Sequence, residues 1–536
     1  MVEPALDSAS AACEAEAHRL YFECHDGTAA LVRWRLRGVL GPPTIESQLA
    51  LAHCEIEAGI DVDLPEIGVR QPAAPSNGRL RDYAEFILSC AWTHFWAGDS
   101  ARASKLVRLV AAVDPHFQSI YEEQIVGSSS RGENGIPDPE DSSEPLPFER
   151  SWRLTDDDAR GVIAQHRGRR VLLFTSQYDG APDAAFENQP CRALRATLTL
   201  LGFAVTVVES QKLTAAEHVA LHDTLRGAIA DFRPDIIVCS DMLISGATGH
   251  RQIQDAILSV LEEARRSSGA KIVFTYTDGW YDGMPALLEA TAGLADLFHV
   301  TFSGLLGRIS PEVAAKTFCY PDPVYDPRPS GTAAPKRRLR AGFVGGISWA
   351  NLSRLVWFAE IQRAGLPVDL HVRAPGGPNA DFKSAIEYAA LNGSYAISLS
   401  LVARVNGSRI ATGRSFETPY FGSLLLEENS DDTAYFLRPY EHYVPFDSLA
   451  QLSERLRILI ADAPRRERIT QAGAAWVRRN FGGLHFWARL LRQLYEGDAA
   501  APPQIGHDYQ PVAVNFPHSV QSYFALARPL APAMRH

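Results

Sequence analysis

The chain has 536 residues, of which 46% are hydrophobic and 21% charged, and its formal net charge is −11. This balance is too apolar for global disorder, and the absence of a sustained period excludes collagen, coiled-coil and low-complexity classes. An acidic chain lacks the basic excess of a non-specific nucleic-acid binder, so we expect no nucleic-acid partner. The length predicts about three to four domains.

Residues 1–125 are predicted to form an all-helical domain, because apolar residues recur at helical spacing and β-branched runs are missing. The expected helices span residues 6–24, 28–38, 44–60, 81–97, 100–113 and 116–124. Two of them meet at Gly98-Asp99. Ala103 follows five residues after Gly98, and Asp114-Pro115 ends the second helix. This spacing resembles one tetratricopeptide repeat, which implies a surface for a protein partner. An ordinary helical hairpin is the alternative.

Residues 126–165 are predicted to be a linker, because Ser, Gly, Pro and acidic residues dominate without any period. Beyond it, apolar strands alternate with amphipathic helices over 166–335 and again over 336–497. The expected strands span residues 171–176, 203–210, 235–241, 271–278, 296–302, 339–346, 368–372, 396–404 and 422–428. This alternation predicts an α/β fold of two tandem Rossmann-like domains, each with a parallel sheet covered on both faces. Residues 498–536 form a Pro/Ala-rich tail.

Seven cysteines at wide spacing, with no Cys-x-x-Cys pair, argue against a disulfide framework and against a zinc site. The N-terminal residues show no signal-peptide pattern, and no apolar run reaches the roughly 18 residues of a transmembrane helix. We therefore expect reduced thiols, no transmembrane segment and a cytoplasmic location.

Ligands of open α/β sheets bind beyond the carboxyl ends of the strands, so residues that follow strands are the first candidates. Gly345-Gly346 ends the first strand of the second unit and precedes a helix. Such a turn can approach a phosphate closely, although a tight turn without a ligand explains it equally well.

The segment from Asn406 to Asp432 and the helical pair that follows carry a more specific pattern. Its elements are Arg414, Phe416, Glu417 and Gly422, then Leu424–Leu426, Val444–Phe446, Ala472-Gly473 and Asn480-Phe481. The pattern resembles the donor-binding domain of GT-B nucleotide-sugar glycosyltransferases, and within them the CgeB-like branch. The resemblance covers residues 338–495 well and 168–330 by pattern alone, and it does not cover 1–150.

The resemblance implies a nucleotide-sugar donor bound by the second unit. Arg409 and Arg414 flank a Thr412-Gly413 turn that can cradle the diphosphate, whose charge must be neutralised as the glycosidic bond breaks. Glu417 is expected to begin a helix and to accept both ribose hydroxyls, and a carboxylate that only offsets the helix dipole is the alternative. Phe416 and His442 complete the expected donor site.

The sequence departs from many retaining members of the fold, because Arg409 stands where they have a second Glu, eight residues before the first. The stereochemical outcome therefore stays open. An inverting enzyme would need a base on the first unit, where Asp179, Asp241 and Asp278 follow strands. Each of these aspartates can instead be a helix cap or a turn former.

Metal-binding Asp-x-Asp patterns occur outside the strand ends, in Asp61-Val62-Asp63 and in Asp156–Asp158. We interpret both as caps or solvated acidic turns, and we expect no metal and no cofactor besides the nucleotide-sugar substrate.

The sequence thus predicts a metal-independent glycosyltransferase. Its acceptor is expected to be a protein held by the helical domain, or a polysaccharide or lipid-linked glycan. The helical domain can also serve docking or homo-oligomerisation. A non-catalytic interaction scaffold and a sugar-nucleotide epimerase are the alternatives from other classes.

Overall fold

The computed structural model describes the helical region in pieces and most of the two α/β units. The described residues are short pieces within 12–19, then 45–59, 80–113 except 97, 125, 136–137, 145–151, 154–175, 189–209, 215–240, 251–276, 283–328, 336–346, 353–373, 384–404 and 408–497. Most of the expected helix over 6–24, the helices over 28–38 and 116–124, and the tail over 498–536 lie outside this set.

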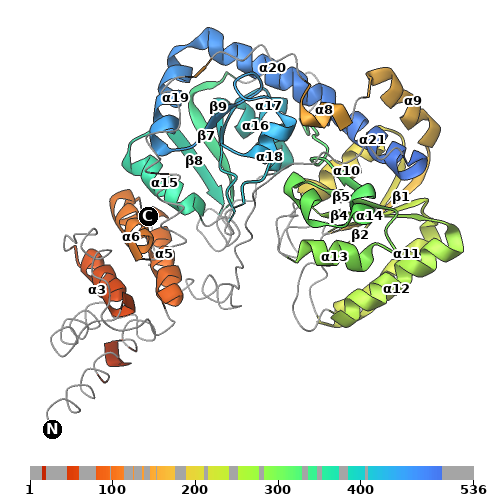
Figure 1. Cartoon of the computed structure of the whole chain (residues 1–536), viewed down its shortest axis with the longest axis horizontal. Coiled ribbons are helices and arrows are strands. Elements are labelled where there is room, and N and C mark those ends of the chain that lie inside the picture. Colours follow the sequence, from red (N-terminus) through yellow and green to blue (C-terminus); the bar gives the residue numbers. More distant parts are fainter. Residues whose placement is uncertain are drawn as a thin grey trace.

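Three helices form the described part of the helical region (Figure 1). They are α3 (Ile45–Glu57), α5 (Leu80–Trp96) and α6 (Ser100–Val113). Helices α5 and α6 turn at Gly98, whose φ of +82° favours glycine. Ala103 has no exposed surface, so the small side chain lies where two helices approach closely. The predicted helix pair is confirmed, and its repeat character stays a prediction.

The first α/β unit is a parallel sheet of six strands, which run β2-β1-β3-β4-β5-β6 across the sheet. The strands are β1 (Arg170–Thr175), β2 (Ala204–Glu209), β3 (Ile236–Ser240), β4 (Lys271–Tyr276), β5 (Leu297–Val300) and β6 (Thr317–Cys319). The helices between and after them are α10 (Gln189–Leu200), α11 (Ala215–Phe232), α12 (Arg251–Ser268), α13 (Met284–Thr291), the 3₁₀ helix η3 (Ser303–Arg308) and α14 (Pro311–Ala315). Strand β6 lies where the sequence predicts the start of a Pro-rich connection, because three residues are too few to show a period.

The second unit is a parallel sheet of five strands in the order β11-β10-β9-β7-β8. The strands are β7 (Arg338–Gly346), β8 (Val368–Arg373), β9 (Tyr395–Ser400), β10 (Leu424–Glu428) and β11 (Val444–Phe446). The helices are α15 (Ser353–Arg363), α16 (Ala385–Gly393), α17 (Gly413–Tyr420), α18 (Asp431–Phe436), α19 (Leu449–Ala461), α20 (Ala463–Phe481) and α21 (Gly483–Glu496).

Each sheet changes direction of strand order between its first and third strands, which are β1 and β3 in one unit and β7 and β9 in the other. The predicted pair of Rossmann-like units is therefore confirmed. In such sheets the crevice at the carboxyl ends of these two strands is the usual ligand position.

Two helices, α8 (Pro147–Ser151) and α9 (Asp156–His166), lie inside the predicted linker over 126–165. Thr155 is the N-cap of α9, and its side chain and that of Asp158 form a capping box. The acidic run Asp156–Asp158 is thus the first turn of a helix, where carboxylates favour the dipole, and its interpretation as a capping segment is confirmed.

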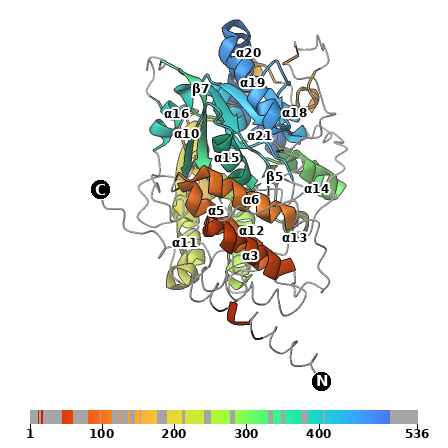
Figure 2. The same cartoon turned by 90° about the vertical axis from the view of Figure 1, so that its left-hand side faces the viewer.

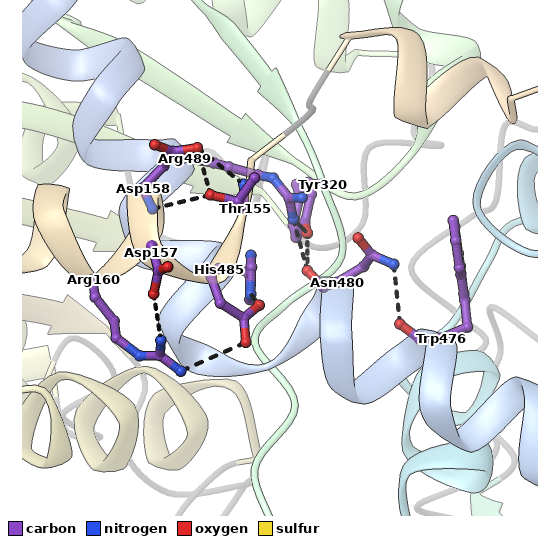
Figure 3. Close-up of polar contacts among 10 residues, drawn as sticks. Thr155, Asp157, Asp158, Arg160, Tyr320, Trp476, Asn480, His485 and Arg489 are labelled. Atoms are coloured by element: carbon purple, nitrogen blue, oxygen red, sulfur yellow. Dashed lines mark hydrogen bonds and ion pairs between the residues drawn. The ribbon is translucent and has the colours of Figure 1, made fainter.

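Helix α21 leaves the second unit and packs on α9 and α10 of the first (Figure 1). Trp487 donates to Thr197 Oγ1 at 2.8 Å, and His485 bonds Asp156 at 2.9 Å. Figure 3 shows Arg489 reaching Tyr320 and the carbonyl oxygen of Asn480. These buried polar contacts join the two units near the segment that connects them.

The helical region packs on the second unit through α6 and α15, which lie side by side in Figure 2. Phe95 stacks on Phe358 with ring centroids 5.9 Å apart. Arg108 binds both carboxylate oxygens of Glu360 at 3.0 and 3.1 Å, and Ser104 donates to the same group. Glu360 has no exposed surface, so the helical region and the second unit share one buried core.

The five described cysteines form no disulfide, as predicted. Within the described residues, none of the helices combines the length and apolarity that crossing a bilayer would require.

Candidate functional site

Arginine side chains gather at the carboxyl end of β7, beside the point where the strand order reverses. The Arg414 guanidinium lies 4.8 Å from the centroid of the Phe343 ring, and its Nη1 approaches the Val344 carbonyl at 3.4 Å. A Cβ atom on Gly345 would overlap that same nitrogen. Gly345 is thus the residue that lets Arg414 lie against the strand end.

Arg354, near the start of α15, also contacts the end of β7. Its guanidinium donates to the carbonyl of Gly346 at 2.7 Å and twice to that of Leu401, at 3.2 and 2.9 Å. The pKa of Arg354 is lowered well below its ordinary value by burial and then by the charges of Arg414 and Arg404. Arg414 and Arg404 thus both lie close enough to Arg354 to repel its charge.

After β9, Ala403 and Arg409 pair in an antiparallel bridge. Glu428, at the end of β10, accepts from the N–H groups of Val402 and Ala403, both at 2.9 Å. Arg409 donates to the Asn429 carbonyl at 3.4 Å and lies 3.9 Å from Glu428. Glu428 thus holds the backbone just before Arg404 and lies beside Arg409.

Helix α17 begins at Gly413, with Thr412 as its N-cap. The expectation that Glu417 begins a helix is therefore wrong, because the helix starts one turn earlier and accommodates Pro419. Glu417 lies in the second turn, is 6% exposed and accepts from the Tyr388 hydroxyl at 2.8 Å. A Cβ on Gly413 would lie 3.6 Å from the Glu417 carboxylate, so that carboxylate lies close to the first residue of the helix.

Two polar atoms at this helix start are buried without a hydrogen-bond partner among the described residues. They are Arg414 Nε and Thr412 Oγ1. Buried polar groups are satisfied in most proteins, by protein or by a ligand. Both atoms belong to the turn that the sequence predicts to cradle a diphosphate.

Two further carboxylates lie buried beneath the site. Glu427 accepts from Ser415 at 2.7 Å and from Thr433 at 2.6 Å, and burial raises its pKa. Asp432 accepts from the Ala411 N–H at 2.7 Å and from the N–H of Ser303, in the first unit, at 2.8 Å. Asp432 therefore ties the segment before α17 to the other unit.

Phe416 and His442 are placed in packed surroundings. Phe416 is 2% exposed and contacts the rings of Phe436 and Phe481. His442 stacks on Trp476 at 4.8 Å, and burial lowers its pKa to about 3. These contacts describe core packing, and a donor contact by either residue stays a prediction.

The glycines of the motif have conformational reasons. Gly422 has a φ of +87° in the turn from α17 into β10. A Cβ on Gly473 would overlap the His442 carbonyl, so glycine allows α20 to approach that loop.

The first unit contributes strand ends, but its three predicted aspartates, Asp179, Asp241 and Asp278, lie outside the described residues.

A surface depression of about 660 Å³ lies elsewhere in the first unit, between α12 and the C-terminal end of α13. Because these helices lead into β4 and β5, the depression is at the amino ends of the strands, the edge opposite to the usual ligand position.

Sequence reasoning missed four residues of this site as site residues: Arg354, Tyr388, Arg404 and Glu428. Arg404 and Glu428 are each the last residue of a predicted strand, so their position at strand ends was a usable signal. Arg354 and Tyr388 lie on helices, and only the fold brings them to the strand ends.

Comparison with known proteins bears on the same part of the chain. Residues 355–495 match the model of a family described as glycosyl transferase-like. This part of the chain is similar to glycosyl transferases. The resemblance predicted over 338–495 is confirmed there, and its CgeB-like refinement stays a prediction. A search of curated proteins finds no match.

Several solved structures align with about three fifths of the chain. HepE from Anabaena, in complex with UDP and glucose, is 12% identical over 60% of this chain and 98% of its own, with a TM-score of 0.39. An α-glucosyltransferase in complex with UDP and DNA is 11% identical over 58% and 96%, with a TM-score of 0.42. Sucrose-phosphate synthase from Thermosynechococcus elongatus is 14% identical over 61% and 99%, with a TM-score of 0.39.

Proposed function

We propose that this protein transfers a sugar from a nucleotide-sugar donor to an acceptor, and that the transfer needs no metal ion. The observation that carries the proposal is the placement of Arg354 and Arg414 together at the end of β7, within a glycosyl transferase-like unit. Like charges held together at a buried strand end are stabilised by an anion, and a diphosphate is the anion that such a donor supplies.

The diphosphate end of the donor is assigned to the turn before α17. Arg414 is held against Gly345 with its Nε available inside the site, and Thr412 presents a buried hydroxyl. The first N–H groups of α17 add partial positive charge at the same place. Arg354 acts as a positioning residue, because carbonyl groups already occupy its guanidinium. Cations and N–H groups thus take the role that a metal ion plays in other transferases.

The nucleoside end is assigned to Glu417. Its buried carboxylate lies one turn beyond the proposed diphosphate position, and Tyr388 fixes one of its oxygens. A carboxylate accepts only, so it selects the two donating hydroxyls of a ribose over groups that accept.

The acceptor is assigned to the first unit, and Asp179, Asp241 and Asp278 stay the proposed candidates for its base. Each follows a described strand, namely β1, β3 or β4, and these strands are neighbours in one parallel sheet. If the reaction inverts the anomeric carbon, changing one of these aspartates to Asn abolishes turnover, whereas a retaining reaction tolerates all three changes.

We also propose that the acceptor is a macromolecule, such as a protein, presented by the helical region. This region is fixed to the donor unit through α6 and α15, so it moves with the donor site.

A thermal-shift screen tests the donor assignment. The wild type and Glu417→Ala are compared with UDP-, GDP-, CMP- and dTDP-sugars, each with and without a chelator. A ligand at a hundredfold excess over its Kd stabilises by about 2.7 kcal/mol, which a melting curve resolves. We expect one nucleotide class to stabilise the wild type in chelator and to leave Glu417→Ala unshifted. If no nucleotide sugar stabilises the wild type, the transferase proposal is wrong and a scaffold role replaces it.

A further inference from the structure

Four side chains with metal-binding atoms meet between α3 and α5, far from the donor site. His53 and Glu57 are one helical turn apart on α3, and Cys90 and His94 are one turn apart on α5. Residues at this spacing share a helix face, so each helix offers two ligands to the other. The ligand atoms of His53, Glu57 and Cys90 all lie within 4.8 Å of one another.

Two separations, both to Oε1 of Glu57, are close to those of a tetrahedral centre, and His94 would join the compact group of His53, Glu57 and Cys90 by moving in as the fourth ligand. Nε2 of His53 lies 3.3 Å from Oε1 of Glu57, and Nε2 of His94 lies 2.7 Å from the same oxygen. Ligand bonds of about 2.0–2.3 Å place neighbouring ligand atoms of a tetrahedral zinc ion roughly 3.3–3.8 Å apart. The His53 pair already has this separation, and the His94 pair would open by less than about 1 Å.

The surroundings keep the group partly enclosed and hold the carboxylate in place. The His53 side chain is 5% exposed, that of His94 18% and that of Glu57 31%. Arg102, on α6, lies 3.7 Å from the second Glu57 oxygen and is itself paired with Asp99. An outer partner on the second oxygen is the usual way in which a carboxylate ligand is oriented.

The His53 ring and the Glu57 carboxylate are in the forms that bind a metal ion, whereas the Cys90 thiol is not. Burial lowers the pKa of His53, so its ring is neutral at pH 7. Burial acts to raise the pKa of Glu57, but hydrogen bonds from the two histidines outweigh it and hold the pKa at about 2. Burial raises the pKa of Cys90, so coordination must release its thiol proton to solvent.

We propose that His53, Glu57, Cys90 and His94 form a structural site for a divalent transition-metal ion, with zinc as the ion that best fits the ligands. Thiolate, imidazole and carboxylate are all zinc ligands, and four protein ligands leave no open position for a substrate. The pattern lacks a Cys-x-x-Cys pair, and the two halves lie on separate helices, which is why the sequence predicted no zinc site. The ion would tie α3 to α5, and through α6 to the α15 face of the donor unit.

The test uses the full chain and two matched variants, Cys90→Ala at the site and Cys191→Ala in the first unit. Each protein is dialysed against metal-free buffer, loaded with zinc, dialysed again and assayed for bound metal by mass spectrometry. Cobalt(II) then replaces zinc, because a thiolate ligand gives a charge-transfer absorption and tetrahedral geometry gives intense visible bands. Glu57→Gln and His94→Gln extend the series with side chains of similar size.

We expect one zinc per chain in the wild type and in Cys191→Ala, and a thiolate-to-cobalt band in both. Cys90→Ala loses that band, and all three site variants bind zinc at least tenfold more weakly. The cobalt spectrum of the wild type stands by itself if a variant fails to fold. A wild type that retains no zinc and shows no thiolate band has only a hydrogen-bond network here, and the proposal is wrong. If Cys90→Ala and His94→Gln both bind zinc as tightly as the wild type does, the proposal is wrong as well.

Discussion

Gly345 and Arg414 are matched to each other across 69 positions of sequence, because a Cβ on Gly345 would occupy the place of Arg414 Nη1. The glycine ends β7 and the arginine begins α17, so the contact joins the two elements that border the proposed diphosphate position. The guanidinium is kept over the Phe343 ring and near the strand end, where an anion can reach it.

Gly345→Ala is expected to weaken donor binding while leaving the fold intact. The added Cβ meets the far end of a flexible side chain, so Arg414 moves away at little cost to stability. Losing a charge-assisted contact costs about 1.5–3 kcal/mol, which weakens binding about 10- to 150-fold. Titration with the stabilising nucleotide sugar measures the change. Gly161→Ala, in the exposed face of α9 with open space around it, is the control and keeps the wild-type Kd.

Glu417→Gln is expected to weaken binding of the nucleotide sugar by at least tenfold. The amide oxygen can still accept from Tyr388, but the amide nitrogen donates and opposes a ribose hydroxyl. Glu454→Gln, on the exposed face of α19, serves as the control. The wild type should bind ribose nucleotides more tightly than deoxyribose nucleotides, and Glu417→Gln should lose this preference. That result would place the ribose of the nucleoside at Glu417. An unchanged Kd in Glu417→Gln would remove Glu417 from the site.

Arg108→Ala is expected to destabilise the helical region and the donor unit together. Burial alone would raise the pKa of Glu360, but bonds from Arg108, Ser104 and Arg363 outweigh it and lower the pKa. Without Arg108 the buried carboxylate loses two of these bonds, at a cost of about 1–3 kcal/mol. Denaturant unfolding followed at both ends of the chain measures this loss. Arg226→Ala, in an exposed ion pair, changes stability by less than about 1 kcal/mol. Two independent transitions, with only one shifted, would contradict the shared core.

Asp432 predicts a specific pH dependence of stability. Burial raises its pKa to about 6, above the usual value of about 3.9 in an unfolded chain. The folded state therefore holds this proton more tightly, so its contribution to stability is full below about pH 4 and is lost as pH rises through about 6. The free energy of unfolding of the wild type minus that of Asp432→Asn should fall by on the order of 2–3 kcal/mol over this window and then level off.

The neighbouring substitution Asp431→Asn provides the comparison for this curve. Asp431 is exposed, so the substitution removes one carboxylate and leaves the contact between Asp432 and Ser303 in place. The curve for Asp431→Asn should show much less of this fall, because Asp432 keeps its bonds from Ala411 and Ser303 in that variant. A flat curve for Asp432→Asn would mean that Asp432 ionises in the folded protein as easily as in the unfolded chain.

The sequence predicts the α/β units well, because buried parallel strands such as β1 and β3 are continuous apolar runs that local pattern detects. It fails at β6, which has three residues, and at α9, whose first turn has the acidic composition of a linker. The start of α17 was misplaced because Pro419 suggested a helix beginning at Glu417. Its true start is set by the N-cap at Thr412, and the proline is accommodated further along.

The sequence predicts the site only in two short local segments, which are Gly345-Gly346 and the run from Arg409 to Glu417. Arg409, Thr412, Gly413, Arg414 and Glu417 lie within nine residues, and their motif indicates a shared role. Arg354 and Tyr388 come from α15 and α16, and nothing in their local sequence marks them. The resemblance of α6 to a helix of a repeat also does not predict that one of its faces packs on α15. That face would be apolar whether it packed on another repeat or on α15.

The central claim is sugar transfer from a nucleotide donor, and turnover of the stabilising nucleotide sugar in the presence of a chelator tests it most directly. Chromatography separates the intact donor, the free nucleotide and the released or transferred sugar over time. We expect the wild type to release nucleotide and sugar without added metal, and Glu417→Gln to do so at least tenfold more slowly at low donor concentration. A donor that binds but is recovered unchanged would contradict the claim and indicate a scaffold, and a sugar recovered on its nucleotide with altered configuration would indicate an epimerase.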